Sequence, residues 1–227
     1  KGMYRLIVRH KVSITNWLPG AYDPKIRTLP GVTEAVRMQW FGGAYVDQSA
    51  KNQFARFSVT DVDRFLRVYD EVKVVEGSEA DWVGDRSGLL VGRQLMKRYG
   101  WRLGQKVSFK GDIYPITLEL TIRAVYAAPD ESGVYFHHQA IEEALPRVKG
   151  YVGWYWLKAD SLAATERVPK QIDAMFENSS FPTRSETEKE FQAMWVSMLG
   201  NVKLLVGSIT TIIGVVILLI AANTMAM

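Results

Sequence analysis

The chain has no cysteine among its 227 residues and only three histidines. The absence of cysteine excludes disulfide bonds, thiol nucleophiles and thiolate metal sites, although it leaves the cellular compartment open. No secretory signal is visible either, because residues 1–11 contain no apolar run ahead of their charges. Since the chain starts at Lys1, we expect a processed or excised segment whose natural N-terminus is missing.

Sequence signatures of nucleotide binding and catalysis are also missing. No GxGxxG or GxxxxGK[ST] string follows an expected strand, and Gly84–Gly88 (GDRSG) does not meet the GxSxG spacing of serine hydrolases. His137 and His138 precede Glu142 and Glu143 at a spacing that can chelate a metal on a helix, but two ligands do not make a site. We therefore expect no catalytic, cofactor-binding or metal-binding residue in this chain.

The charge is mildly basic, with 28 Lys and Arg against 24 Asp and Glu and a net charge of +4. Acidic residues are interspersed with the basic ones, as in residues 61–71 and 186–190, instead of leaving a basic stripe. A nucleic-acid-binding protein is expected to gather Lys and Arg on one face. The pattern thus argues against nucleic acid as a partner.

The longest apolar run, LLVGSITTIIGVVILLIAA, covers residues 204–222 without a charge. This length is enough to cross about 30 Å of hydrocarbon as a helix, so the sequence predicts a transmembrane helix over residues 204–223. Gly207, Thr211 and Gly214 fall on one side of it, where a second helix could approach closely. The alternative is that these residues only reflect the high glycine content of membrane helices.

A second helical pattern precedes this run. Ser185 and Glu188 have the spacing of a capping box, which predicts that a helix begins at this point. Apolar side chains recur at helical spacing after it, and they are Phe191, Met194, Trp195, Met198 and Val202. The sequence predicts a stalk helix over residues 185–203 that continues into the membrane and transmits movement through this apolar stripe.

The preceding residues predict an α+β domain with two lobes. Residues 1–73 and 149–184 show strands alternating with helices, and we expect them to form one mixed α/β lobe. Residues 74–148 are rich in glycine-punctuated β segments and predict an inserted β-rich lobe. The aromatic strand from Tyr151 to Leu157 is interpreted as core, and a ligand surface is the alternative.

Four strings carry a family resemblance, in order and at plausible spacing. They are IRTLPGVTEAVRMQWFGG (26–43), GLLVGRQLMKRYGWRLGQKVSF (88–109), LELTIRAVYAAP (118–129) and IIGVVILLIAANTMAM (212–227). With the order of elements, they resemble the periplasmic core domain of MacB-type ABC transporter permeases, which belong to the wider FtsX-like family. The resemblance covers nearly the whole chain.

The resemblance implies a non-catalytic permease subunit of the cytoplasmic membrane, with residues 1–203 mainly on its periplasmic or extracellular side. It implies membrane helices before and after this domain, a second permease copy, membrane lipid, and an ABC ATPase that holds ATP and Mg outside this chain. An adaptor or other envelope protein is a further expected partner. The implied function is to transmit ATP-driven conformational change for export, efflux or lipoprotein handling. The alternatives are an interaction module that regulates a partner hydrolase and a membrane-anchored enzyme.

Overall fold

A computed structural model of the protein describes residues 4–47, 49, 52, 54–194, 196, 197 and 217. The chain divides into two compact units, Lys1–Glu186 and Thr187–Met227. The first unit contains most of the described residues and is a mixed α/β domain. In the second unit, residues 188–194, 196, 197 and 217 are helical.

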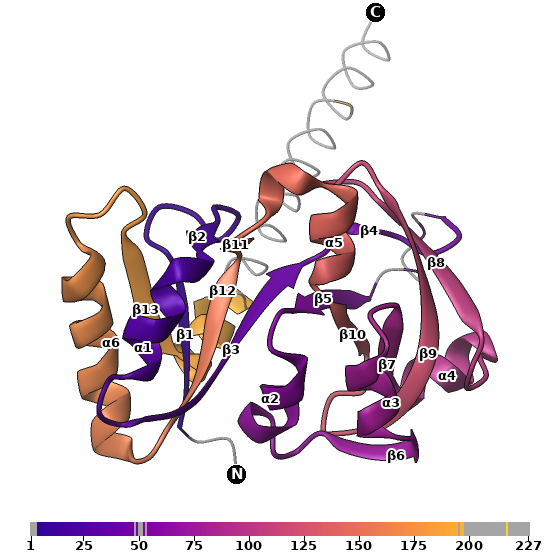
Figure 1. Ribbon diagram of the computed structural model, residues 1–227, viewed down its shortest axis with the longest axis horizontal. Coiled ribbons are helices and arrows are strands. Elements are labelled where there is room, and N and C mark those ends of the chain that lie inside the picture. The colour runs from indigo at the N-terminus through magenta and orange to yellow at the C-terminus, as the bar shows by residue number, and fades with distance from the viewer. Residues whose placement is uncertain are drawn as a thin grey trace, which may run out of the picture. The chain divides into compact units, whose positions relative to one another are not determined.

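Most strands of the first unit belong to one large sheet (Figure 1). Its order is β13-β1-β12-β3-β5-β10-β7-β9-β8-β4, and β6 pairs with β9 off this path. The short strands β2 and β11 form a separate pair. The strands are β1 (Arg5–His10), β2 (Leu18–Pro19), β3 (Val32–Trp40), β4 (Gly43–Ala44), β5 (Ala55–Val59), β6 (Lys73–Gly77), β7 (Gly88–Gly92), β8 (Lys106–Gly111), β9 (Thr117–Ala127), β10 (Gly133–His137), β11 (Tyr151–Val152), β12 (Trp154–Ala159) and β13 (Thr183–Thr187).

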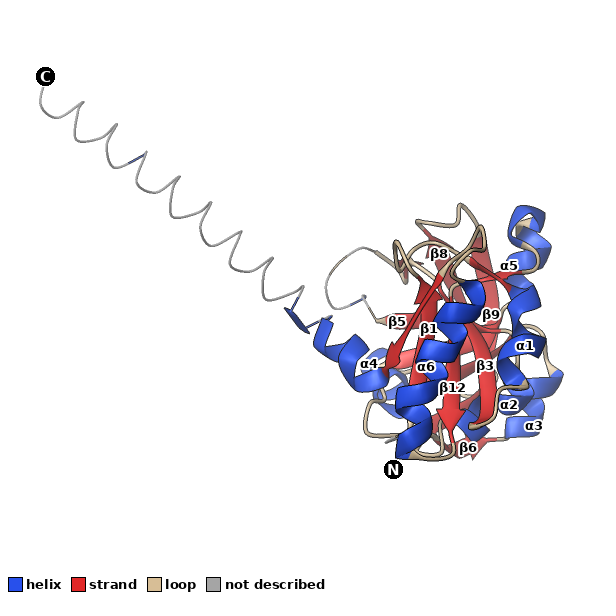
Figure 2. Ribbon diagram, turned by 90° about the vertical axis from the view of Figure 1, so that its left-hand side faces the viewer, coloured by secondary structure: helices blue, strands red, loops and turns tan. Residues whose placement is uncertain are grey.

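The helices are mostly short, and α1, α2, α3 and α5 lie along the same side of the sheet in Figure 2. Two of them contact the central strand β3, namely α1 and α2. The longest, α6, contacts β1 and β12 near the sheet edge that ends in β13. The helices are α1 (Asp23–Arg27), α2 (Val62–Val68), α3 (Glu79–Gly84), α4 (Arg93–Tyr99), α5 (Gln139–Ala144) and α6 (Leu162–Phe176), with 3₁₀ turns η1 (Gly20–Tyr22) and η3 (Pro146–Val148).

Segments from the two ends of the chain lie together in the sheet. Strands β13, β1, β12 and β3 come from these ends and occupy one side of β5, whereas β10, β7, β9 and β8 come from the middle of the chain and occupy the other (Figure 1). The parallel pairing of β5 with β10 joins the two sides. The two-lobe division itself, with its boundaries at 73/74 and 148/149, stays a prediction.

Two apolar clusters fill the interior on the two sides. One is built from the chain ends and includes Leu6, Leu18, Ile26, Ala35, Tyr155, Leu157, Val168 and Ile172. The other comes mainly from the middle of the chain and includes Leu89, Leu95, Trp101, Phe109, Leu120, Ile122, Val134 and Phe136. Trp154, Tyr155 and Trp156 of β12 are all buried, which supports a core role for this aromatic strand.

Helix α6 is amphipathic and supplies one wall of the chain-end cluster. Its N-cap is Ser161, whose hydroxyl oxygen accepts a hydrogen bond from the backbone N–H of Ala164 at 3.3 Å. The helix then runs without interruption past Pro169, although proline cannot donate the backbone hydrogen bond expected there. Burial of Val168, Ile172 and Phe176 against the sheet outweighs this loss.

We expect Ile172→Ala to lower the free energy of unfolding by roughly 2–5 kcal/mol, because it removes a fully buried side chain and leaves a cavity. Leu162→Ala on the same helix is the matched control, since Leu162 is largely exposed. Urea denaturation followed by circular dichroism measures both. An equal loss for the two variants would contradict the packing of α6 described above.

Candidate functional site

Strand β13 is the last element of the first unit, and it is tied to β1 by a buried ion pair. Nε of Arg9 donates to Oε1 of Glu186 at 2.6 Å, and their side chains are only 7% and 9% exposed. Both charges have left bulk water, so each depends on the other for compensation. The pair therefore fixes the end of β13 against the sheet.

A second contact ties β13 to helix α6 through the carboxylate of Asp173. Its Oδ1 accepts hydrogen bonds from the hydroxyls of Thr183 at 2.9 Å and Ser185 at 2.8 Å. Its Oδ2 accepts the backbone N–H of Ser185 at 3.0 Å. We call the set formed by Arg9, Asp173, Thr183, Ser185 and Glu186 the β13 anchor.

The helix that follows β13 begins two residues later than the sequence predicted. Thr187 forms the capping box with Glu190: Oγ1 of Thr187 accepts from the N–H of Glu190 at 3.2 Å, and Oε2 of Glu190 accepts from the N–H of Thr187 at 2.8 Å. The expected box of Ser185 with Glu188 is wrong, because Ser185 lies in β13 and its hydroxyl is bound to Asp173. Residues 185–187 thus belong to a strand, and the helical residues start at 188.

Only part of the predicted transmission stripe falls on described residues. Phe191 is buried, and Met194 is half-buried on the helical segment 188–194. Trp195, Met198 and Val202 lie outside the described residues, as do the predicted packing residues Gly207, Thr211 and Gly214. These residues keep the status of predictions.

The predicted membrane helix over residues 204–223 also lies outside the description, except for Ile217. Within the described parts of the chain, no helix combines the length and apolar character needed to cross a bilayer.

We expect Asp173→Ala to destabilise the first unit by roughly 1–3 kcal/mol, the cost of leaving buried donors unpaired. The donors concerned are the Thr183 hydroxyl and the N–H and hydroxyl of Ser185. Gln171→Ala, an exposed position on the same helix, serves as the control. Thermal unfolding that is the same for both variants would show that Asp173 does not hold β13.

A second polar cluster lies where α1, β3 and the start of α2 meet. Arg37 of β3 binds Asp61 in a bidentate manner, with Nε at 2.9 Å from Oδ2 and Nη2 at 2.8 Å from Oδ1. Burial opposes ionisation of Asp61, but the hydrogen bonds and charge of Arg37, with the charge of Arg27, prevail and lower its pKa. Arg27 in turn binds Asp23 of α1 at 2.6 Å. The cluster joins two helices to the central strand.

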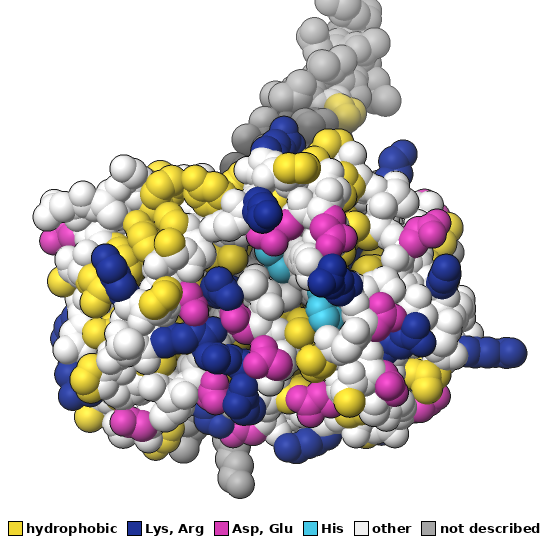
Figure 3. All heavy atoms as spheres, in the orientation of Figure 1, with side chains coloured by type: hydrophobic (Ala, Val, Ile, Leu, Met, Phe, Trp, Pro, Cys, Tyr) yellow, Lys and Arg dark blue, Asp and Glu magenta, His cyan; other side chains and the backbone are white. Residues whose placement is uncertain are grey.

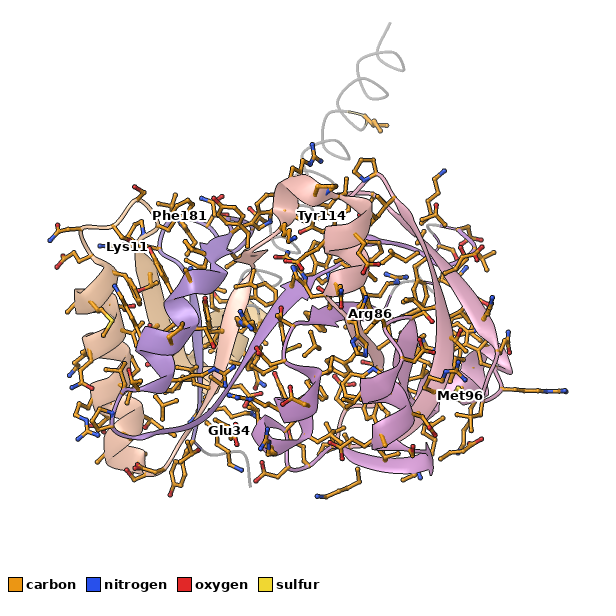
Figure 4. All side chains as sticks on the ribbon, viewed as in Figure 1. Lys11, Glu34, Arg86, Met96, Tyr114 and Phe181 are labelled. Atoms are coloured by element: carbon orange, nitrogen blue, oxygen red, sulfur yellow. The ribbon has the colours of Figure 1, made fainter. Side chains whose placement is uncertain are left out.

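A groove runs beside this cluster, with a volume of about 290 Å³. Figure 3 shows basic and acidic side chains close together across this part of the surface, over α1, β3 and α2. We call it the β3 groove, and its lining residues are Arg27, Val32, Thr33, Glu34, Ala35, Arg64 and Arg67. Figure 4 labels Glu34, which lies beside α2.

The two adjacent histidines occupy structural positions. Nε2 of His137 lies 2.7 Å from the carbonyl oxygen of Trp82, and Nε2 of His138 lies 3.1 Å from that of Tyr151. Both rings therefore donate to backbone carbonyls, which uses a nitrogen that a metal would need. Among the residues that the structure describes, no group of three or more His, Asp or Glu could hold a metal ion.

His138 also contacts Ser58 and Glu142, in an arrangement that superficially resembles a hydrolase triad. Nδ1 of His138 lies 2.9 Å from the Ser58 hydroxyl, and Nε2 lies 3.9 Å from Oε1 of Glu142. Ser58, however, is completely buried, so no substrate can reach its hydroxyl. The contact joins β5 to α5 and is structural.

Burial lowers the pKa of His138 below 6.5, although Glu142 opposes the shift. Because the folded state then binds this proton less readily than the unfolded state, stability falls as the pH drops below 6.5, by at most about 1.4 kcal/mol per pH unit. We expect His138→Asn to show a shallower loss between neutral and mildly acidic pH than the wild type. The charged groups acting on the ring are Glu142 and Arg37, and both remain in the variant. If the free energy of unfolding, measured by urea titration, fell with pH equally steeply in the two proteins, the result would contradict this expectation.

The first unit is a mixed α/β domain, and comparisons place the chain in a family. The family model described as the MacB-like periplasmic core domain matches residues 5–175. The chain belongs to this family, as its sequence strings indicated. No curated protein matches the chain.

Solved structures of similar fold come from transporter domains. The extracellular domain of the noncanonic ABC-type transporter YknZ from Gram-positive bacteria has a TM-score of 0.59 at 10% identity, covering 81% of this chain and 98% of its own. The periplasmic region of MacB from Actinobacillus actinomycetemcomitans has a TM-score of 0.59 at 9% identity, covering 85% and 92%. A domain of a putative permease protein from Porphyromonas gingivalis has a TM-score of 0.53 at 14% identity, covering 81% and 89%.

The residues of the β13 anchor and of the Arg37–Asp61 cluster were not identified from the sequence. Arg9 and Glu186 are separated by 177 positions, and no local spacing reports such a pair. One signal was available: Arg5 and Arg9 are four positions apart on an expected strand with apolar residues between them, so they share one face of the strand, and that face turns out to be buried. A buried arginine requires a carboxylate partner or comparable compensation, but the sequence does not say which one.

Proposed function

We propose that this chain is the extracytoplasmic domain of an ABC transporter permease and that it receives ATP-driven movement through the helix that begins at residue 188. The family assignment supports the permease context. The observation that carries the transmission role is the β13 anchor, which holds the strand directly before this helix by a buried ion pair and by Asp173.

The physical argument concerns stiffness. A displacement of the helix start is passed to the sheet only if the connecting strand does not yield, because a compliant linker absorbs the movement. Here β13 passes into the helix without a loop, since β13 ends at Thr187 and the helical residues start at 188. The Thr187–Glu190 capping box fixes the first turn in addition.

The proposed assembly contains an ABC ATPase with its ATP and Mg, a second permease copy, and an adaptor or other envelope protein outside the cytoplasmic membrane. Residues 204–223 span the membrane in this proposal, and residues 1–203 lie mainly on its periplasmic or extracellular face. The work done is export, efflux or lipoprotein handling.

The test uses the full-length permease with its ATPase in nanodiscs. Hydrogen exchange of residues 183–194 is compared with ATP and with ADP, for the wild type, Arg9→Glu, Glu186→Arg and the double variant with the charges exchanged. We expect the nucleotide-dependent change in exchange to fall at least about fivefold in each single variant and to recover in the double variant, while ATP hydrolysis continues in all.

Two results would speak against transmission through this strand. One is a wild type whose exchange in residues 183–194 is the same with ATP and ADP. The other is a folded single variant that responds to ATP as the wild type does. Circular dichroism melting of each variant identifies any that fails to fold.

A further inference from the structure

The β3 groove presents guanidinium groups whose hydrogen-bonding capacity is largely unused. Arg64 and Arg67 line it from α2, with side chains 39% and 55% exposed, and neither donates a side-chain hydrogen bond within the described part of the protein. Arg27 lines it from α1, but its guanidinium is already paired, with Nε 2.6 Å from Asp23 and Nη2 3.2 Å from Asp61. A guanidinium offers five N–H donors in a planar fork that matches a carboxylate.

The acidic groups near Arg64 and Arg67 lie too far away for strong hydrogen bonds, and of these carboxylates Asp63 is 61% exposed and Glu34 24%. Glu34 is 3.5 Å from Nε of Arg67, and Asp63 is 3.6 Å from its Nη2 and 3.8 Å from Nε of Arg64. Exposed ion pairs with such spacing contribute only about 0–1 kcal/mol each. Asp23 and Asp61 face Arg27, but they are already engaged by Nε of Arg27 and by Arg37. A carboxylate arriving from outside can therefore displace Glu34 or Asp63 at little cost.

The size of the groove restricts what can occupy it. Its volume of about 290 Å³ lies at the lower limit for small-molecule pockets, and it is open to solvent. A free small molecule would stay largely exposed, whereas a side chain carried by a second protein is covered by the surface of that protein. The half-buried Val32 adds a small apolar contact for the methylene groups of such a side chain.

We propose that the β3 groove is a docking site for an acidic side chain, Asp or Glu, on an extended segment of a protein partner. Arg64 and Arg67 bind its carboxylate, and Arg27 lies at the α1 side of the groove. Glu34 acts as a competitor that occupies Arg67 when the partner is absent. This interaction does not depend on ATP or on the transport role, so the two can fail separately.

The experiment measures binding of a fluorescein-labelled peptide of alternating Glu and Ala to the full chain in detergent micelles, by fluorescence anisotropy at low salt. We expect the double variant R64Q/R67Q to raise the Kd by at least about tenfold, because it removes charge-assisted hydrogen bonds. We expect Glu34→Gln to lower the Kd, because the competitor is gone. Arg86→Gln is the matched control: Arg86 is an exposed arginine located away from Glu34 in Figure 4, and it should leave the Kd unchanged.

Three results would overturn the proposal. The first is a Kd that is the same for wild type and R64Q/R67Q, including the case of no measurable binding to either. The second is equal binding of a peptide in which Gln replaces Glu, which would exclude recognition of the carboxylate. The third is displacement of the peptide by inorganic phosphate at equal or lower concentration, which would identify a small-anion site instead. All substituted positions are at least partly exposed, so the variants are expected to fold.

Discussion

The buried ion pair between Arg9 and Glu186 is the constraint on which the rest of the structure depends. It joins the first strand of the domain to the last, across 177 positions of the chain, so that both ends of the chain share one sheet edge. Glu186 also lies 3.6 Å from Nε of Arg184, whose side chain is 61% exposed, so the buried contact with Arg9 at 2.6 Å is the closer of its two ion pairs, and losing it costs more than losing an exposed pair. The pair therefore holds β13, the strand directly before this helix, against β1, as the proposed transmitting role requires.

The polar clusters at β3 and β5 also join separate segments of the chain, in the middle of the sheet. Arg37 and Asp61 connect the central strand to α2, and His138 connects β5 to α5 next to the β5–β10 pairing. The interior polar groups thus lie where separate segments of the chain must keep their register, while the two apolar clusters supply most of the burial. Arg64 and Arg67 of the β3 groove differ from these groups, because they are more exposed and only weakly paired. That contrast separates a structural role from a binding role.

Much of the element order could be predicted from the sequence. The alternation over residues 117–123 and the helical spacing of Val168, Ile172 and Phe176 report local geometry directly, and both elements are present in β9 and α6. The start of the C-terminal helix was misplaced because Ser185 with Glu188 and Thr187 with Glu190 have the same capping spacing. Only the position of Asp173, which engages Ser185, decides between them. The β13 anchor and the β3 groove were not predicted, since each brings together residues from segments that are distant in the sequence, such as Arg9 with Glu186 and residues 32–35 with Arg64 and Arg67.

The most direct measurement for this account is a double-mutant cycle on Arg9 and Glu186, using Arg9→Met, Glu186→Met and the double variant, with unfolding free energies from urea titration. We predict that each single change lowers the free energy of unfolding by roughly 3–5 kcal/mol, because it removes the closest ion-pair partner of a buried charge, and that the double variant loses clearly less than the sum of the two. Single costs that simply add in the double variant would show that the two residues act independently. In that case β13 would not be held by this pair, and the transmitting role proposed for this strand would lose its support.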